Sequence, residues 1–239
     1  MANTTTRLQL RTRAKRRADM ENTTFVSDAE WNDYINQGNS ELYDLIVTVY
    51  GDYFVTQAPA FADNRSDGIY DVATAITANN VYKILGVDMA VNGSTVRLKK
   101  FSFAERNMYD SNIATLYGFE NHMWHYQGDT IRIIPSNASG NNITVWYVPE
   151  APELTHDSDA GTGVVPSVYN RGWEEYIVVY AARKALLKEE SNTNKLDEEL
   201  LRMAASIQAF AANREAGESG RITDVTKGTL SSKSLVHYS

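Results

Sequence analysis

The stretch from residue 172 to residue 217 constrains the fold of this chain more than any other part of the sequence. Its first half repeats apolar residues at helical spacing, among them Trp173, Ile177 and Tyr180. Polar residues at 191–194 interrupt the pattern, which then resumes and ends near a glycine. Because so short a connection leaves the second helix no room to lie elsewhere, the pattern predicts an antiparallel αα-hairpin.

A second helix is predicted directly after Ser27. Ser27 and Glu30 have the spacing of a capping box, in which each residue satisfies a backbone amide of the other. The helix is expected to stop at Tyr50 and Gly51. Its apolar stripe can pack on the hairpin to give a bundle of three or four helices, and it comprises Trp31, Tyr34, Ile35, Gly38, Leu42, Leu45, Ile46 and Val49.

Between residues 53 and 148 the periodicity changes to that of strands. Asn92-Gly93 is a strong signal for a tight hairpin turn. Alternation of apolar and polar residues indicates a half-buried antiparallel sheet, with strands expected at 53–61, 81–87, 95–103, 119–126, 130–134 and 142–148.

These patterns predict an α+β fold, because the strands are grouped between helical segments. We expect an antiparallel helical bundle, made of N-terminal helices and the C-terminal αα-hairpin, with an inserted antiparallel β-sheet region and an extended C-terminal tail. The expected divisions are a helical bundle domain at 1–51 and 170–218, an inserted β domain at 52–152, a loop at 153–169 and a C-terminal arm at 219–239.

Charge is distributed unevenly along the chain. The net charge is −7, yet the first twenty residues hold six basic residues against one acidic residue. A helix is expected at 4–20, and it either contacts an acidic protein or nucleic acid, or is a solvated helix packed through its few apolar residues. No aromatic residues lie among the basic ones, so a stacking platform for single strands is not indicated. The candidate contact residues are Arg7, Arg11, Arg13, Lys15, Arg16 and Arg17.

Patterns for catalysis or ligand binding are weak. The chain has no cysteine, no phosphate-binding glycine motif and no paired-histidine metal motif. Two histidines, His122 and His125, are expected on opposite faces of a strand and cannot chelate together. The segment 63–68 begins like a calcium loop but lacks the required carboxylates, so a turn is expected. Asp157 and Asp159 are more consistent with a solvated loop than with a cation site. We therefore expect no enzymatic activity, no metal, no cofactor and no membrane span.

Several long segments resemble one protein family. They are WEEYIVVYAARKALLKEESN at 173–192, AANREAGESGRITDV at 211–225, DMENTTFVSDAEWNDYINQGNSELYDLIV at 19–47, KILGVD at 83–88 and FSFAERN at 101–107. Together they resemble the head–tail adaptor (connector) proteins of tailed bacteriophages.

The resemblance implies a non-enzymatic virion protein at the capsid vertex. Such proteins form a ring, typically of twelve subunits, beneath the portal, where the ring extends the DNA channel and docks the tail. The implied partners are other copies of the chain, the portal, tail proteins (nozzle, tube or stopper) and genomic DNA passing without specific contacts, with assembly in the host cytoplasm. A portal-binding arm is implied, with candidate residues Arg221, Ile222, Thr223, Asp224, Val225, Leu230, Leu235 and Tyr238.

The basic N-terminal helix leaves a second hypothesis open. A DNA-binding accessory to genome packaging would use this helix, and it would bind duplex DNA with a steep dependence on salt. A ring-forming adaptor would bind DNA poorly. The acidic excess in the rest of the chain fits a channel through which DNA slides without sticking.

Overall fold

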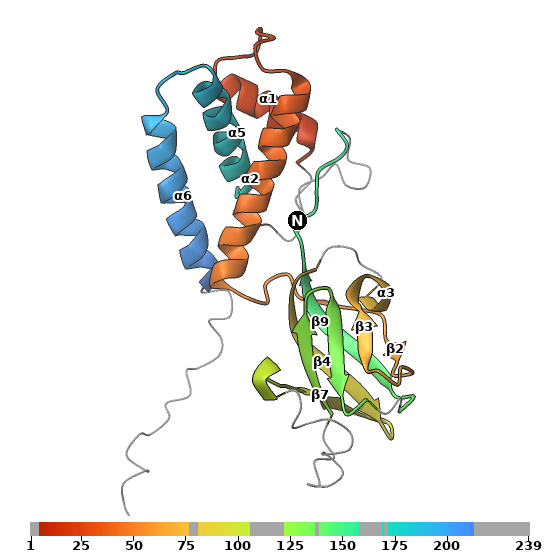
Figure 1. Ribbon diagram of the computed structural model, residues 1–239. Helices are drawn as coiled ribbons and strands as arrows, with labels where there is room; N and C mark the ends of the chain where they lie inside the picture. Colours follow the sequence, from red (N-terminus) through yellow and green to blue (C-terminus); the bar gives the residue numbers. More distant parts are fainter. Residues whose placement is uncertain are drawn as a thin grey trace, which may run out of the picture.

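The computed structural model of the chain is mixed α+β, as the sequence predicts. It describes residues 5–76, 81–105, 122–136, 139–157, 169 and 172–212. The longer helices are α1 (Arg7–Arg17), α2 (Asp28–Val49), α5 (Glu174–Lys188) and α6 (Asn194–Ala212), and a short helix, α3, covers Val72–Ile76. Helices α1, α2, α5 and α6 gather at one end of the molecule and the strands, with the short helix α3, at the other (Figure 1).

Helix α5 lies at the centre of the helical part. It packs against α1, α2 and α6, and side chains on all of its sides are buried, including Ile177, Val178 and Ala182. The sequence pattern predicts only one apolar face for this helix, which is wrong. A helix that is apolar around its circumference is buried by neighbours on several sides, and the uncharged run from Val178 to Ala182, with two valines, a tyrosine and two alanines, provides that surface.

Helix α2 crosses α5 closely because Gly38 has no side chain. A Cβ atom placed on Gly38 would lie 3.1 Å from Cδ1 of Tyr180, which is tighter than ordinary van der Waals contact. The predicted capping box at the start of α2 is confirmed, since Ser27 Oγ accepts from the Glu30 amide and the Glu30 carboxylate accepts from the Ser27 amide.

The strands form two sheets. The first has the order β1 (Thr56–Gln57), β9 (Asn142–Pro149), β4 (Val81–Val91), β5 (Ser94–Arg97), with β2 (Phe61–Ala62) also paired to β9. The second has the order β3 (Ile69–Asp71), β8 (Thr130–Ile134), β7 (Met123–Gln127), β6 (Lys99–Lys100). All pairs are antiparallel except β6 with β7.

Apolar side chains of both sheets share a second core. Met89 and Val145 from the first sheet pack in one buried cluster with Trp124, Ile131 and Ile133 from the second. Alternate residues along β8 and β9 supply these side chains, as expected for strands with one buried face.

The prediction of a single strand at 95–103 is wrong. Leu98, just after β5, is buried, and its amide donates to the Val87 carbonyl of β4 in the first sheet. The next residues form β6 in the second sheet, so this segment crosses between sheets, and a short 3-10 helix follows at Phe103–Glu105. The short strand β3 and helix α3 were not predicted, because segments of three to five residues carry little periodicity.

The expected 92–93 turn is confirmed. Asn92 and Gly93 both adopt positive φ, and they join β4 to β5. Within the part of the chain that the structure describes, no helix is long and apolar enough to cross a bilayer.

Replacing Gly38 with valine should destabilise the fold. The new side chain meets Tyr180 in a packed core, where overpacking costs about 1–3 kcal/mol. We expect a lower free energy of unfolding in urea for Gly38→Val, with an unchanged m value. Gln37→Val, at the exposed neighbouring position of the same helix, introduces the same side chain without the clash. Equal effects of the two substitutions would contradict a close α2–α5 contact.

Candidate interaction site

Helix α1 carries the six basic residues that the sequence singles out. Thr6 caps its first turn, and Gln9 completes a capping box that was not predicted. Its apolar side is narrow: Leu10 and Ala14 are fully buried in the helical core, together with Ala18 just beyond the helix. The basic side chains therefore spread over the remaining circumference, where their partners decide what the helix can bind.

Every one of these six side chains forms an ion pair with a carboxylate of the same chain. Arg7 Nε lies 2.7 Å from Asp157 Oδ1, and Lys15 Nζ lies 2.6 Å from Asp28 Oδ1. The shortest pair of each residue joins Arg7 and Arg11 to Asp157, Arg13 to Glu175, Lys15 to Asp28, Arg16 to Glu21, and Arg17 to Glu199. Two longer pairs join Arg11 to Asp28 and Arg17 to Glu175. The acidic neighbour of α1 is thus contributed by the chain itself.

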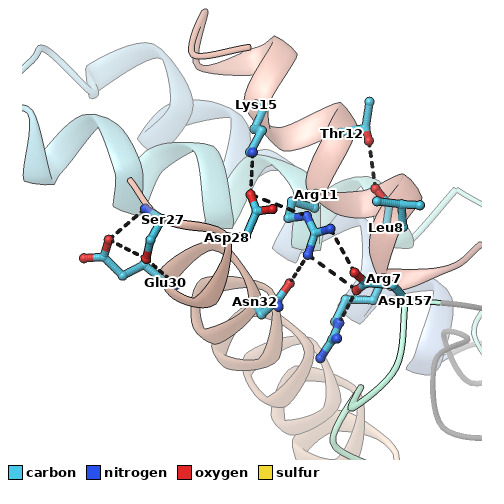
Figure 2. Close-up of polar contacts among 10 residues, drawn as sticks. All are labelled: Arg7, Leu8, Arg11, Thr12, Lys15, Ser27, Asp28, Glu30, Asn32 and Asp157. Atoms are coloured by element: carbon cyan, nitrogen blue, oxygen red, sulfur yellow. Dashed lines mark hydrogen bonds and ion pairs between the residues drawn. The ribbon is translucent and has the colours of Figure 1, made fainter. Parts of the chain in front are cut away.

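Arg11 is the most enclosed of the six, with its side chain only 10% exposed. Figure 2 shows its guanidinium between two elements: Nη2 lies 2.8 Å from Asp157 Oδ2, and Nη1 donates to Asn32 Oδ1 at 2.9 Å. Arg7 adds a hydrogen bond from Nη1 to the Leu154 carbonyl at 2.6 Å. Two arginines one helical turn apart therefore fasten the segment at 154–157 to the helices.

Helix α2 also holds this part of the chain, at residues 152 and 154. Asn39 donates from Nδ2 to the Pro152 carbonyl at 2.8 Å, and Asn36 accepts from the Leu154 amide at 3.0 Å. Leu154 is buried in the helical core. The segment that leaves β9 is therefore part of the packed structure, which corrects the expectation of a solvated loop around Asp157.

The electrostatics of this network favour ionised carboxylates. Burial raises the pKa of Asp157, but hydrogen bonds from Arg7 and Arg11 outweigh that effect and the pKa is lowered overall. A hydrogen bond from Lys15 lowers the pKa of Asp28.

A further ion pair joins the end of α5 to the start of α2. Lys188 Nζ, at the end of α5, lies 2.6 Å from Glu30 Oε1 at the start of α2. Hydrogen bonds from Lys188 and from the Ser27 amide lower the pKa of Glu30 to about 2.

Other candidate residues have structural partners. Asp63, at the start of the turn that resembles a calcium loop, is buried and accepts from Ser139 N at 3.1 Å, from Ser139 Oγ and from the Tyr70 hydroxyl. His125 Nδ1 lies 3.1 Å from the Phe101 carbonyl oxygen. Among the described residues, no three His, Cys, Asp or Glu side chains gather as a metal site requires.

Some sequence predictions fall on residues that the structure does not describe. Asp159 is one of them, and so is the whole candidate arm, Arg221, Ile222, Thr223, Asp224, Val225, Leu230, Leu235 and Tyr238. The carboxylates that pair with α1 were missed by sequence reasoning. They lie up to 182 residues away along the chain, and no local pattern links them to the basic helix.

Replacing Asp157 with asparagine should destabilise the protein at neutral pH. The folded-state pKa of Asp157 is lowered from 3.8, so its ion pairs stabilise the fold above that pH and lose their effect as the pH falls below it. Because the carboxylate is 39% exposed and therefore screened, we expect a loss of about 1 kcal/mol at pH 7.

The measurement is urea unfolding at pH 7 and near pH 3, where the difference between Asp157→Asn and wild type should shrink. Glu21→Gln is the matched control, because the Arg16–Glu21 pair lies at the surface with side chains 67% and 51% exposed. An equal loss in both variants, or a pH-independent loss for Asp157→Asn, would show that the ion pairs of Arg7 and Arg11 with Asp157, here called the clamp, do not stabilise the fold.

The chain was compared with known protein families and with curated proteins. The family model described as SU10 adaptor protein matches residues 5–229, which include all the described helices and both sheets. No curated protein matches the chain. The family match confirms the resemblance seen in the sequence: the chain belongs to the SU10 adaptor protein family, a family of bacteriophage head–tail adaptors, and has a structural role in the phage.

Proposed function

We propose that this protein forms an oligomeric ring beneath the portal of a tailed bacteriophage, extends the DNA channel and docks the tail. The family match over residues 5–229 carries the proposal, because it involves the helices, the sheets and part of the C-terminal residues together. Membership of an adaptor family implies contact with portal and tail proteins and a place in the virion neck. Assembly would take place in the host cytoplasm.

The ring would be built by repeated contact between unlike faces of neighbouring subunits. A heterologous contact closes into a ring when the rotation between subunits divides a full turn, and we propose twelve subunits. The antiparallel helical bundle, residues 1–51 and 170–218, would form the ring wall as one domain. Residues 52–152 would be the inserted β domain, and the two separate apolar cores support this division.

The C-terminal arm, residues 219–239, would contact the portal. Residues 221–225 would begin the contact, and Leu230, Leu235 and Tyr238 would supply apolar anchors among serines and threonines. An extended segment of this composition can add main-chain hydrogen bonds along a partner and insert a few side chains into pockets.

DNA would pass the ring without specific contacts. The alternative hypothesis, a DNA-binding packaging accessory, requires α1 to present free positive charge. All six candidate basic residues of α1 are paired with carboxylates instead, and the net charge of the chain is −7. Both observations favour the adaptor over the DNA binder.

Apolar anchors in the arm should be required for association with the portal. The triple variant Leu230→Ala, Leu235→Ala, Tyr238→Ala should lose at least about tenfold in affinity, since truncating one buried interface anchor commonly costs more than 1 kcal/mol. Light scattering and negative-stain microscopy of the protein, alone and with portal, would measure ring formation and binding.

Ser231→Ala, Ser232→Ala, Ser234→Ala is the matched control, with three truncations in the same segment but no loss of apolar surface. It should assemble like the wild type. If both triple variants form rings with portal equally well, the arm does not bind the portal through these anchors. If the chain stays monomeric with portal, the proposal of an adaptor ring is wrong.

Duplex DNA should bind weakly, with a shallow dependence on salt. A protein that neutralises Z phosphates shows a slope of about −0.9Z in log affinity against log salt concentration, and paired arginines leave few charges for this. Fluorescence anisotropy with a labelled duplex at several salt concentrations measures the slope. The triple variant Arg13→Gln, Arg16→Gln, Arg17→Gln is the comparison. A steep slope in the wild type that is lost in this variant would favour the packaging accessory.

A further inference from the structure

An apolar groove of about 440 Å³ lies between helices α2, α5 and α6. Its floor and walls include Leu45 of α2, Tyr176 of α5, and Leu200 and Ala204 of α6. Leu201, at its rim, is 74% exposed. An exposed leucine beside half-buried apolar side chains indicates a surface that another apolar segment can cover.

A second, acidic groove of about 750 Å³ continues the first. Both are lined by Glu41 and Tyr180, so they form one surface across the helices. Five carboxylates line the acidic part, and none of them forms an ion pair within the part of the chain that the structure describes. They are Asp33, Glu41, Asp44, Glu150 and Glu153.

The combination defines what an occupant needs. It must place apolar side chains against the leucines of α2 and α6 and positive charge along the carboxylates. Residues 225–238 have this chemistry: they contain Lys227 and Lys233, no acidic side chain, and the apolar residues Val225, Leu230, Leu235, Val236 and Tyr238.

We propose that residues 225–238 of the same chain occupy this groove in the free protein. Helix α6 ends at Ala212, and Leu201 lies eleven residues earlier, about 17 Å back along the helix axis. The twelve residues at 213–224 can span up to about 40 Å when extended. They include Gly217 and Gly220, which permit the chain to turn back along α6.

The tether favours the chain's own groove over that of another copy. A connection of twelve residues gives the segment an effective concentration in the millimolar range, well above the micromolar concentrations at which subunits meet in solution. Docking in cis is therefore independent of protein concentration.

The docked segment would regulate the arm. It contains Val225 and the three anchor positions that the proposed function assigns to the portal, so the portal has to displace it from the groove. Free subunits would then keep their apolar anchors covered until they meet the portal. The inference rests on the proposed function only where it says that the arm later binds the portal. Docking in the groove is measured on the free chain, without portal.

The absence of cysteine allows a direct test. Ser234→Cys carries a single fluorophore in the full-length protein, and steady-state anisotropy reports whether the segment is held. We expect high anisotropy that is constant from nanomolar to micromolar protein. Adding Leu201→Asp should lower the ratio of docked to free segment by about tenfold or more, because one leucine loses its burial.

Leu8→Asp is the matched control, since Leu8 is an exposed leucine on α1, away from the groove. It should leave the anisotropy unchanged. Lys227→Glu, Lys233→Glu should lower the anisotropy as Leu201→Asp does, because it reverses the charge that faces the acidic groove. Circular dichroism and hydrogen exchange of residues 225–238 show whether each variant is folded and whether backbone protection follows the label.

Low anisotropy in the Ser234→Cys protein would overturn the proposal, and so would an anisotropy that Leu201→Asp leaves unchanged. Anisotropy that rises with protein concentration would show docking in a neighbouring copy and would also overturn it. Ring formation with portal, measured separately by mass, distinguishes these results from a failure of the adaptor function.

Discussion

The burial of helix α5 is the constraint on which the helical part depends. Its side chains from Tyr176 to Ala182, together with Ala185, are buried among α1, α2 and α6, and the four helices share one core. Such packing removes much apolar surface from water, at roughly 25 cal/mol per Å². At the crossing with α2, the missing side chain of Gly38 permits the close approach of Tyr180.

The ion pairs of helix α1 follow from this packing. Once α1 lies against α5, its arginines face Asp157, Glu175 and Glu199, and the positive charge of the N-terminal region is compensated within the chain. The clamp of Arg7 and Arg11 also links the helices to the segment that leaves the sheets.

Much of the architecture could be predicted from local patterns. The capping box at Ser27, the turn at Asn92-Gly93 and the helical hairpin all depend on neighbours within a few residues, so the sequence reveals them. The crossing from β5 to β6 could not be predicted, because it depends on their partner strands: β5 pairs with β4 in the first sheet and β6 with β7 in the second. The burial of α5 on all sides likewise depends on three other helices.

The amino-acid sequence by itself determined the fold class, the longer helices and strands, and membership of the adaptor family, since periodicity, turn chemistry and long matching segments are local properties. Only the tertiary structure decided what the basic helix contacts. Its partners lie 146 to 182 residues away in several cases, and the same charges on an isolated helix would be free to bind DNA. The fold determines the availability of a charge because an ion pair requires two side chains within a few ångströms, and distance along the chain does not specify distance in space.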